Sequence, residues 1–337
     1  MDPKIIEELQ HSTTRLPPFL FRAFSVECSR GINDTQEMRP MRTRGFPRQS
    51  IFAQPYDETR GMLREHLLWN YRSPSNFISW SSSIIWVLEH AARMHRHEEK
   101  SNVHIAVMDV KKIHDMAIFP ATTLMRVYRV PASGDDKAHK LQRAFYTSEY
   151  LFYGALLNSK YDPCFKAVRW DHFCKADLCN TMTTFSARPT NDDRLYLRIE
   201  ELRVSLPNGN GMVRSQDMLP PIVAIASLFG TEFQVVVTIA LITTLYGHRT
   251  PLATDFIRYV TNLRLNCPRD VKDIVGFDFR SQIDPNLVKV VRMYETLTGT
   301  LGLSRGSGDT MTTEAEGEQT ASVASMAVQV GGMTLST

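Results

Sequence analysis

Apolar and polar residues alternate in three short stretches of the chain's first half. Residues Phe19–Phe24 read FLFRAF, residues Val103–Val110 read VHIAVMDV, and residues Glu149–Leu156 read EYLFYGAL. Such alternation, with many aromatic and β-branched residues, is typical of half-buried strands. The pattern therefore predicts a sheet, with Arg22 inside one strand and Glu149 at the start of another.

The clearest helical pattern follows a run of serines. Ser81–Ser83 precede the sequence IIWVLEHAARM, whose apolar residues recur on one helical face. Serine is a favoured N-cap residue, so a helix is expected to begin directly after this run. Residues from about 215 to 300 also carry helical periods and few strand signals. We therefore expect an α+β protein with a mainly helical C-terminal region.

One apolar segment is long enough to cross a bilayer. Ile222–Gly247 reads IVAIASLFGTEFQVVVTIALITTLYG and is interrupted only by Glu232 and Gln234. An ionisable group near the middle of such a segment is costly in lipid. Gly230 and Thr231 also divide it into two pieces of buried-helix length. We expect a buried helical hairpin, with a membrane span as the alternative.

Two other segments differ in composition from the rest of the chain. Residues 303–337 contain no aromatic residue and are rich in Gly, Ser and Thr, which predicts a disordered tail. Arg30–Pro55 is rich in Arg and Pro without periodicity, which predicts a long solvated loop with local positive charge. The expected division is residues 1–168, residues 169–302 and the tail.

Charge and cysteine content narrow the possible partners and compartment. The 39 Lys and Arg residues nearly balance the 36 Asp and Glu residues, giving a formal charge of +3. This charge gives no reason to expect a nucleic acid or an anionic membrane as partner. The N-terminus lacks a secretory signal pattern, and the 5 cysteines are few and odd in number. We expect a cytoplasmic protein without structural disulfides.

Four possible soft metal ligands lie close together in the sequence. They are Cys164, His172, Cys174 and Cys179, in the spacing C-x7-H-x-C-x4-C. Closed zinc sites normally contain tighter cysteine pairs, such as C-x2-C. We therefore predict no metal site here.

Three polar residues at the predicted strands are candidates for chemistry. Arg22 is flanked by apolar residues, so it either extends to solvent or reaches an anionic group. Capping explains Ser81–Ser83 but not Ser79, which could present its hydroxyl to a ligand. Glu149 is partly desolvated beside its apolar strand unless it faces solvent or has a partner.

These residues follow one another in the order Arg, Ser, Glu on successive predicted strands. In this respect the chain resembles the Arg-Ser-Glu branch of the ADP-ribosyltransferase superfamily, which includes cholera-toxin-like and arginine-directed enzymes. It is also similar to uncharacterised fungal proteins with an enterotoxin-like domain. The resemblance lies in LFRAFS around Arg22, in FISWSSSIIW with Ser79 and Ser81 as the outer serines, and in TSEYLFYGAL with Glu149. It covers residues from about 15 to 165.

The resemblance implies a split antiparallel β-sheet core and NAD as the substrate. It implies that Arg22 anchors the dinucleotide through its pyrophosphate, for which a guanidinium is well suited. It further implies that Ser79 and Ser81 orient the dinucleotide. Glu149 would then stabilise the positive charge that develops on the nicotinamide ribose as the glycosidic bond breaks.

Two residues depart from the family pattern. Trp80 stands where threonine is usual, and we expect it to stack on or wall the nicotinamide site. Thr147 stands where arginine-modifying members have Glu or Gln, so an acceptor other than protein arginine, or water, is expected. The same departures leave an alternative open, in which the fold is kept without catalysis and the apolar helical region binds a partner.

Overall fold

The computed structural model describes ten stretches of the chain. They are residues 2–14, 16–27, 31–40, 50–70, 72–97, 101–113, 117–130, 146–158, 163–175 and 219–246. The chain divides into two units, Met1–Leu297 and Thr298–Thr337. The second unit, and with it the predicted tail, lies outside the described residues. The predicted boundary at residue 168 stays a prediction.

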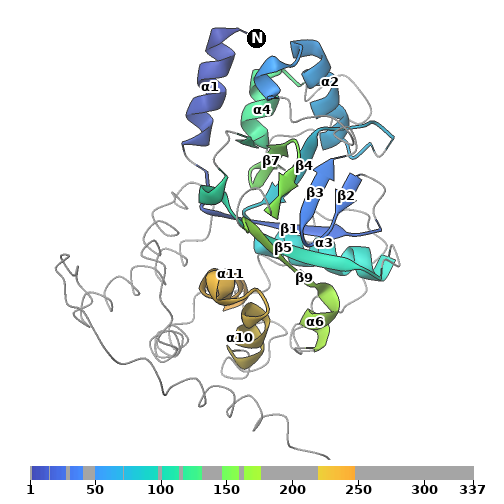
Figure 1. Ribbon diagram of the computed structural model, residues 1–337, viewed down its shortest axis with the longest axis vertical. Helices are drawn as coiled ribbons and strands as arrows, with labels where there is room; N and C mark the ends of the chain where they lie inside the picture. Colours follow the sequence, from blue (N-terminus) through green and yellow to red (C-terminus); the bar gives the residue numbers. More distant parts are fainter. Residues whose placement is uncertain are drawn as a thin grey trace, which may run out of the picture. The chain divides into compact units, whose positions relative to one another are not determined.

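Two antiparallel sheets form the centre of the first unit, which confirms the α+β class (Figure 1). One sheet has six strands in the order β6-β7-β4-β1-β5-β9, and the other has three in the order β2-β3-β8. The strands are β1 (Phe19–Ser25), β2 (Gly31–Asn33), β3 (Glu37–Pro40), β4 (Phe77–Ser81), β5 (Val103–Asp109), β6 (Ile118–Pro120), β7 (Glu149–Tyr153), β8 (Leu156–Leu157) and β9 (Phe165–Arg169). The three predicted strands are therefore β1, β5 and β7. The third is shorter than expected because Gly154, at φ 98°, ends it.

Helices surround these sheets (Figure 1). They are α1 (Pro3–Thr13), α2 (Tyr56–Leu67), α3 (Ile84–His97), α4 (Ala121–Val127), α6 (Trp170–Lys175), α10 (Leu219–Ser227) and α11 (Thr231–Tyr246), with short 3-10 turns η2 (Ile51–Ala53) and η3 (Val110–Lys112). The helix predicted after the serines is α3. The Val87 N–H donates to the Ser83 carbonyl oxygen at 3.3 Å, so the serine run leads directly into it.

The segment Arg30–Pro55, predicted to be one long loop, contains β2, β3 and η2. The prediction was wrong because the hairpin depends on turn chemistry and not on hydrophobic alternation. The Asp34 side chain accepts the backbone N–H groups of Gln36 and Glu37, each at 2.7 Å, which fixes the turn between the two strands. Residues 41–49 of this segment lie outside the described residues.

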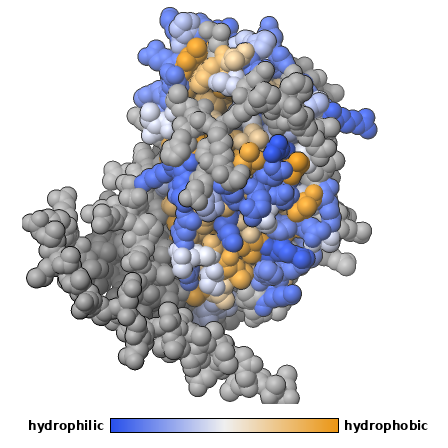
Figure 2. Space-filling model, in the orientation of Figure 1, coloured by the Kyte–Doolittle hydropathy of each residue, from blue (hydrophilic) through white to orange (hydrophobic). Residues whose placement is uncertain are grey.

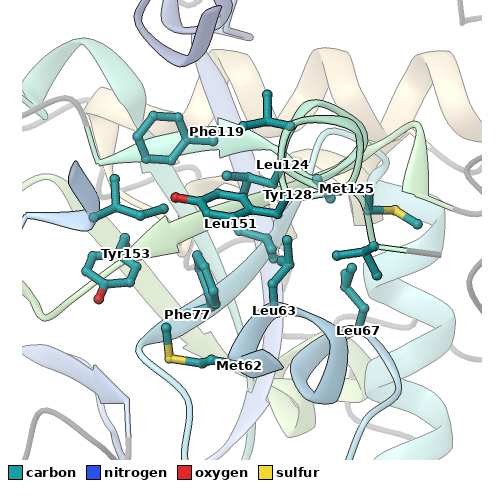
Figure 3. Close-up of a cluster of buried hydrophobic side chains, with 14 of the residues drawn as sticks. Met62, Leu63, Leu67, Phe77, Phe119, Leu124, Met125, Tyr128, Leu151 and Tyr153 are labelled. Atoms are coloured by element: carbon teal, nitrogen blue, oxygen red, sulfur yellow. The ribbon is translucent and has the colours of Figure 1, made fainter. Parts of the chain in front are cut away.

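Apolar side chains pack on both faces of β4 and β7, because successive strand residues point to opposite sides. Phe77 and Leu151 belong to one cluster, and Ile78 and Phe152 belong to another. Figure 3 shows the first cluster, in which α2 and α4 contribute side chains around Tyr128. Its fully buried members include Leu9, Leu63, Phe119, Ala121, Leu124, Met125, Tyr128 and Leu151. These contacts fix α2 beside β4.

The apolar segment predicted to form a buried hairpin is α10 and α11, joined at Gly230. Its buried side chains include Ile222, Ile225, Ala226, Phe229, Phe233, Val236, Val237 and Leu241. Phe233 packs edge-on against Phe19 of β1, with ring centroids 6.3 Å apart. Phe229 packs in the same way against Phe173 of α6, at 6.0 Å. The hairpin prediction is confirmed, and its apolar surface is used within the first unit.

Across the described residues, no helix is both long and apolar enough to span a membrane.

Candidate functional site

The structure brings Arg22, Ser79 and Glu149 together on three neighbouring strands. They lie on β1, β4 and β7, which are consecutive in the order of the six-stranded sheet. Ser81 is the partner of Phe21 on one side and of Glu149 on the other. The three residues predicted to act together are thus neighbours in the fold, although they are far apart in the sequence.

Ser79, Ser81 and Glu149 lie on the same face of this sheet. Ser81 pairs directly with Glu149, and Ser79 pairs with Leu151. Residues two apart on a strand point to the same side, and diagonal cross-strand neighbours are within reach of long side chains. The Ser79 hydroxyl accordingly hydrogen-bonds the Glu149 carboxyl group.

The Glu149 carboxyl group titrates near neutral pH. Burial of this group raises its pKa from 4.5 to about 7, because a carboxylate loses hydration when protein surrounds it. The hydrogen bond from Ser79 and the positive charge of Arg22 act in the opposite direction and only partly offset the burial. A desolvated carboxyl group with this pKa is typical of a functional site.

Arg22 links three strands at the edge of this site. Its Nη1 donates to the Ser79 backbone oxygen at 2.5 Å, and its Nη2 donates to Asn33 Oδ1 on β2 at 3.2 Å. The described pairing of β1 with β4 consists of the single pair Phe21–Ser81, so the Ser79 carbonyl lies beyond that ladder. Arg22 therefore holds the strands at the point where β1 and β4 separate, and it supplies positive charge beside Glu149.

His66 is a site residue that the sequence analysis missed. Its Nε2 lies 2.9 Å from Ser79 Oγ, and its ring packs against Phe77 with centroids 5.8 Å apart. His66 comes from α2, whose neighbouring residues Met62, Leu63 and Leu67 are buried in the cluster of Figure 3. No sequence pattern indicates this contact, because a lone histidine on an amphipathic helix does not show which strand it will contact.

The hydroxyl of Ser79 connects His66 and Glu149. When Glu149 is ionised, the Ser79 O–H can donate to the carboxylate and accept from a protonated Nε2 of His66. When Glu149 is protonated, both bonds can reverse, so that Ser79 donates to a neutral Nε2. The arrangement can therefore hold a proton at either end.

Ser81 and Trp80 lie on opposite faces of β4. Ser81 is buried, and its Oγ accepts the backbone N–H of Ser83 at 3.0 Å, so it fixes the entry to α3. Trp80 is only 1% exposed and belongs to the apolar cluster with Ile78, on the face opposite Ser79. The structure therefore does not bring Trp80 together with Ser79 and Glu149.

The possible soft ligands do not gather into a metal site in the described part of the chain, where no three His, Cys, Asp or Glu side chains are placed to hold an ion. Cys164 is fully buried, and burial raises the pKa of its thiol to about 12, so it stays protonated at neutral pH. Cys174 is half-buried, and Cys179 lies outside the described residues.

One comparison with known proteins matches the part of the chain that contains this site. A family model described as a domain of unknown function (DUF7587) matches residues 15–159. A search of curated proteins found no match, and neither did a search of solved structures. The matched stretch contains Arg22, His66, Ser79 and Glu149, and it ends before β9 and the α10–α11 hairpin.

Proposed function

We propose that this chain is an NAD-dependent ADP-ribosyltransferase-like enzyme with a split antiparallel β-sheet core. In this proposal it cleaves the bond between nicotinamide and ribose and transfers ADP-ribose to an acceptor or to water. The observation that carries the proposal is the place of Glu149 in the sheet, where it pairs with Ser81, hydrogen-bonds the Ser79 hydroxyl and lies within the electrostatic influence of Arg22. A desolvated carboxylate and a hydroxyl are suited to bind a ribose, and a guanidinium is suited to bind a pyrophosphate.

The reaction follows from the charges of the groups involved. The C1′–N1 bond breaks, its electron pair stays on N1, and the pyridinium ring becomes neutral nicotinamide. The ribose carbon is left with oxocarbenium character, which the ionised Glu149 stabilises electrostatically while it accepts a ribose hydroxyl. A lone pair of the acceptor oxygen then forms the new bond to C1′, and the acceptor loses one proton. With water as acceptor, the products are nicotinamide, ADP-ribose and a proton.

His66 is suited to take up that proton. Thr147, at the position where arginine-modifying relatives carry an acid or amide, has no proton-accepting group of this kind. The His66 Nε2 lies one hydrogen bond from Ser79, which in turn touches Glu149. When Glu149 is ionised, His66 Nε2 carries the proton that it donates to Ser79, so Nδ1 of the neutral imidazole is the atom that takes up the acceptor's proton. His66 serves here as the general base for the acceptor.

The packing of the α10–α11 hairpin is relevant to the alternative function. In that alternative the protein is not catalytic and binds a partner through its apolar helical region. Phe233 and Phe229 instead pack against Phe19 and Phe173 of the same unit. This packing favours the enzymatic proposal, because it leaves the hairpin less apolar surface to offer to another protein.

Nicotinamide release from NAD tests the proposed function. The wild-type protein is expected to release nicotinamide, and Glu149→Gln is expected to reduce the rate by about a hundredfold or more, since it removes the stabilising charge. Glu7→Gln makes the same chemical change on the exposed surface of α1 and should leave the rate unchanged. Equal release by wild type and Glu149→Gln, or none by wild type, would end the proposal.

A further inference from the structure

Three aromatic rings form a cluster where α2 and α3 meet. Trp69 follows the end of α2, and Trp86 and His90 lie on the first turns of α3. The ring centroids of Trp69 lie 6.2 Å from Trp86 and 5.3 Å from His90, and Trp86 lies 5.0 Å from His90. The cluster therefore connects the helix that carries His66 with the helix that follows Ser79 and Ser81.

Trp69 keeps an exposed ring within this cluster. The residue is 37% exposed, whereas Trp86 and His90 are half-buried. Its ring meets Trp86 at 71° and His90 at 66°, so neither of these neighbours stacks in parallel on it. An exposed indole supported from the side offers a flat surface to another planar ring.

The backbone holds Trp69 in an unusual conformation. Its φ is 57°, in the left-handed region that normally favours glycine after a helix. The Trp69 N–H donates to the backbone carbonyl oxygen of His66, and the Asn70 N–H donates to that of Glu65, each at 3.0 Å. These two bonds form a Schellman turn. A bulky residue in this region costs free energy, so the ring is fixed in place at some expense of stability.

A second helix end shows what the same turn looks like without an aromatic residue. Arg129 follows α4 at φ 48°, with its N–H bonded to the Arg126 oxygen at 3.2 Å and the Val130 N–H bonded to the Met125 oxygen at 2.9 Å. Arg129 is exposed. The turn alone therefore does not require tryptophan, and what distinguishes Trp69 is its place in the aromatic cluster beside His66.

We propose that the ring of Trp69, supported by Trp86 and His90, is the platform on which a heteroaromatic ring of the dinucleotide stacks. This inference rests on the proposed function. The Trp69 N–H bonds the backbone oxygen of His66, and the His66 side chain lies against Ser79, so the platform follows one helical turn after a residue of the candidate site. Trp69 thereby takes the stacking role that the sequence suggested for Trp80. The ring is either adenine or nicotinamide. Both rings are planar, and each is attached to one of the two riboses of NAD.

Binding measurements on the full chain test the platform. Dissociation constants for NAD are measured by calorimetry for wild type, Trp69→Gly, Trp69→Leu and Arg129→Gly. Glycine suits a φ of 57°, and leucine keeps apolar bulk without a ring. Both Trp69 variants should bind NAD about tenfold more weakly, since stacking of one base on an aromatic residue has about this value. Arg129→Gly changes the same kind of turn and should bind as wild type does.

Two fragments identify the ring. If Trp69→Gly weakens ADP-ribose but not nicotinamide mononucleotide, the stacked ring is adenine; the reverse pattern identifies nicotinamide. If the Trp69 variants bind all three ligands as tightly as Arg129→Gly does, the platform is refuted and the proposed function stands. If wild type binds none of the three, both proposals fall.

Discussion

The protein environment of Glu149 disfavours the ionised form of its carboxyl group. Burial outweighs the Ser79 hydrogen bond and the Arg22 charge, so its pKa lies at about 7. An exposed glutamate would be ionised at all physiological pH values, whereas Glu149 is ionised in only part of the molecules near neutrality. In the proposed reaction the ionised form is the one that stabilises a cationic ribose, so nicotinamide release should rise as the pH increases through about 7.

The same burial predicts that Glu149 lowers the stability of the fold. Between pH 4.5 and about 7 the folded state binds more protons at this site than the unfolded state does. The free energy of unfolding therefore falls as the pH rises through this window, and the loss is complete above it. At pH 8 the free energy of unfolding of Glu149→Gln should exceed that of wild type by roughly 1–2 kcal/mol. This value is lower than the full pKa shift implies, because solvent partly screens the Glu149 carboxyl group.

Urea unfolding at pH 8 and at pH 4.5 measures this difference. The two proteins should be nearly equally stable at the lower pH, where Glu149 is protonated in the folded state and about half protonated in the unfolded state. A Glu149→Gln protein that is less stable than wild type at pH 8 would show that the carboxylate is well accommodated, contrary to the desolvation described above.

His66→Gln separates proton transfer from substrate binding. Glutamine can keep a hydrogen bond to Ser79 but cannot accept the acceptor's proton. We expect the rate of NAD hydrolysis to fall by about a hundredfold, within the usual range for a general base, while NAD affinity changes little. The pH dependence of the remaining rate should still reflect Glu149. Unchanged hydrolysis in the His66→Gln protein would assign His66 a purely structural role.

Some site residues could be predicted from the sequence and others could not. Arg22, Ser79 and Glu149 each stand out because a polar side chain interrupts or opens an apolar strand. His66 and Asn33 reach the site through tertiary packing that no local pattern encodes. Trp80 follows the strand alternation, which places it with Ile78 in the core and not with Ser79.

At the level of elements, strands with strong alternation were predictable and short ones were not. β1, β5 and α3 follow from hydrophobic periodicity. β2 and β3 have 3 and 4 residues, too few to show a period, and the side chain of Asp34 fixes their turn. The β2 strand nevertheless supplies Asn33, which receives a hydrogen bond from Arg22. A short element thus contributes directly to the candidate site.

The α10–α11 hairpin should be an integral part of the fold. Phe233 is 2% exposed and packs on Phe19, three residues before Arg22. Phe233→Ala is expected to lower the free energy of unfolding by about 3–4 kcal/mol, as for other buried phenylalanines. Leu228→Ala, at a position that is 38% exposed in the same hairpin, should lower it by less than about 0.5 kcal/mol. Chemical denaturation followed by circular dichroism measures both.

Equal, small effects of these two substitutions would favour the interaction-protein alternative, in which the hairpin is free to bind a partner.

At the scale of the whole molecule, the folded unit extends beyond the family match. The match ends at residue 159, but β9 pairs with β5 from His104 to Met108, and Phe165 of β9 is buried in the core. Figure 2 shows hydrophobic patches among hydrophilic side chains on one face of this unit. Removing β9 and the hairpin would expose further apolar surface, including Phe19.

Truncated chains test how far the folded unit extends beyond the family match. A chain ending at residue 159 should aggregate or remain unfolded, because β5 loses its edge partner and the core loses Phe165. A chain ending at Tyr246 keeps β9 and both hairpin helices and should unfold cooperatively on heating. Size-exclusion chromatography and thermal melts distinguish the two outcomes. A cooperative, monomeric protein from the shorter chain would show that the matched segment is an independent domain.

We propose that Ser79 and Glu149 act as one NAD-cleaving site. The rate of nicotinamide release by wild type, Ser79→Ala, Glu149→Gln and the double variant tests this proposal. Residues that act as a unit show non-additive losses. We expect release by wild type, a loss in each single variant, and a double variant no slower than Glu149→Gln. Losses that multiply in the double variant, or no release by wild type, would refute the proposal.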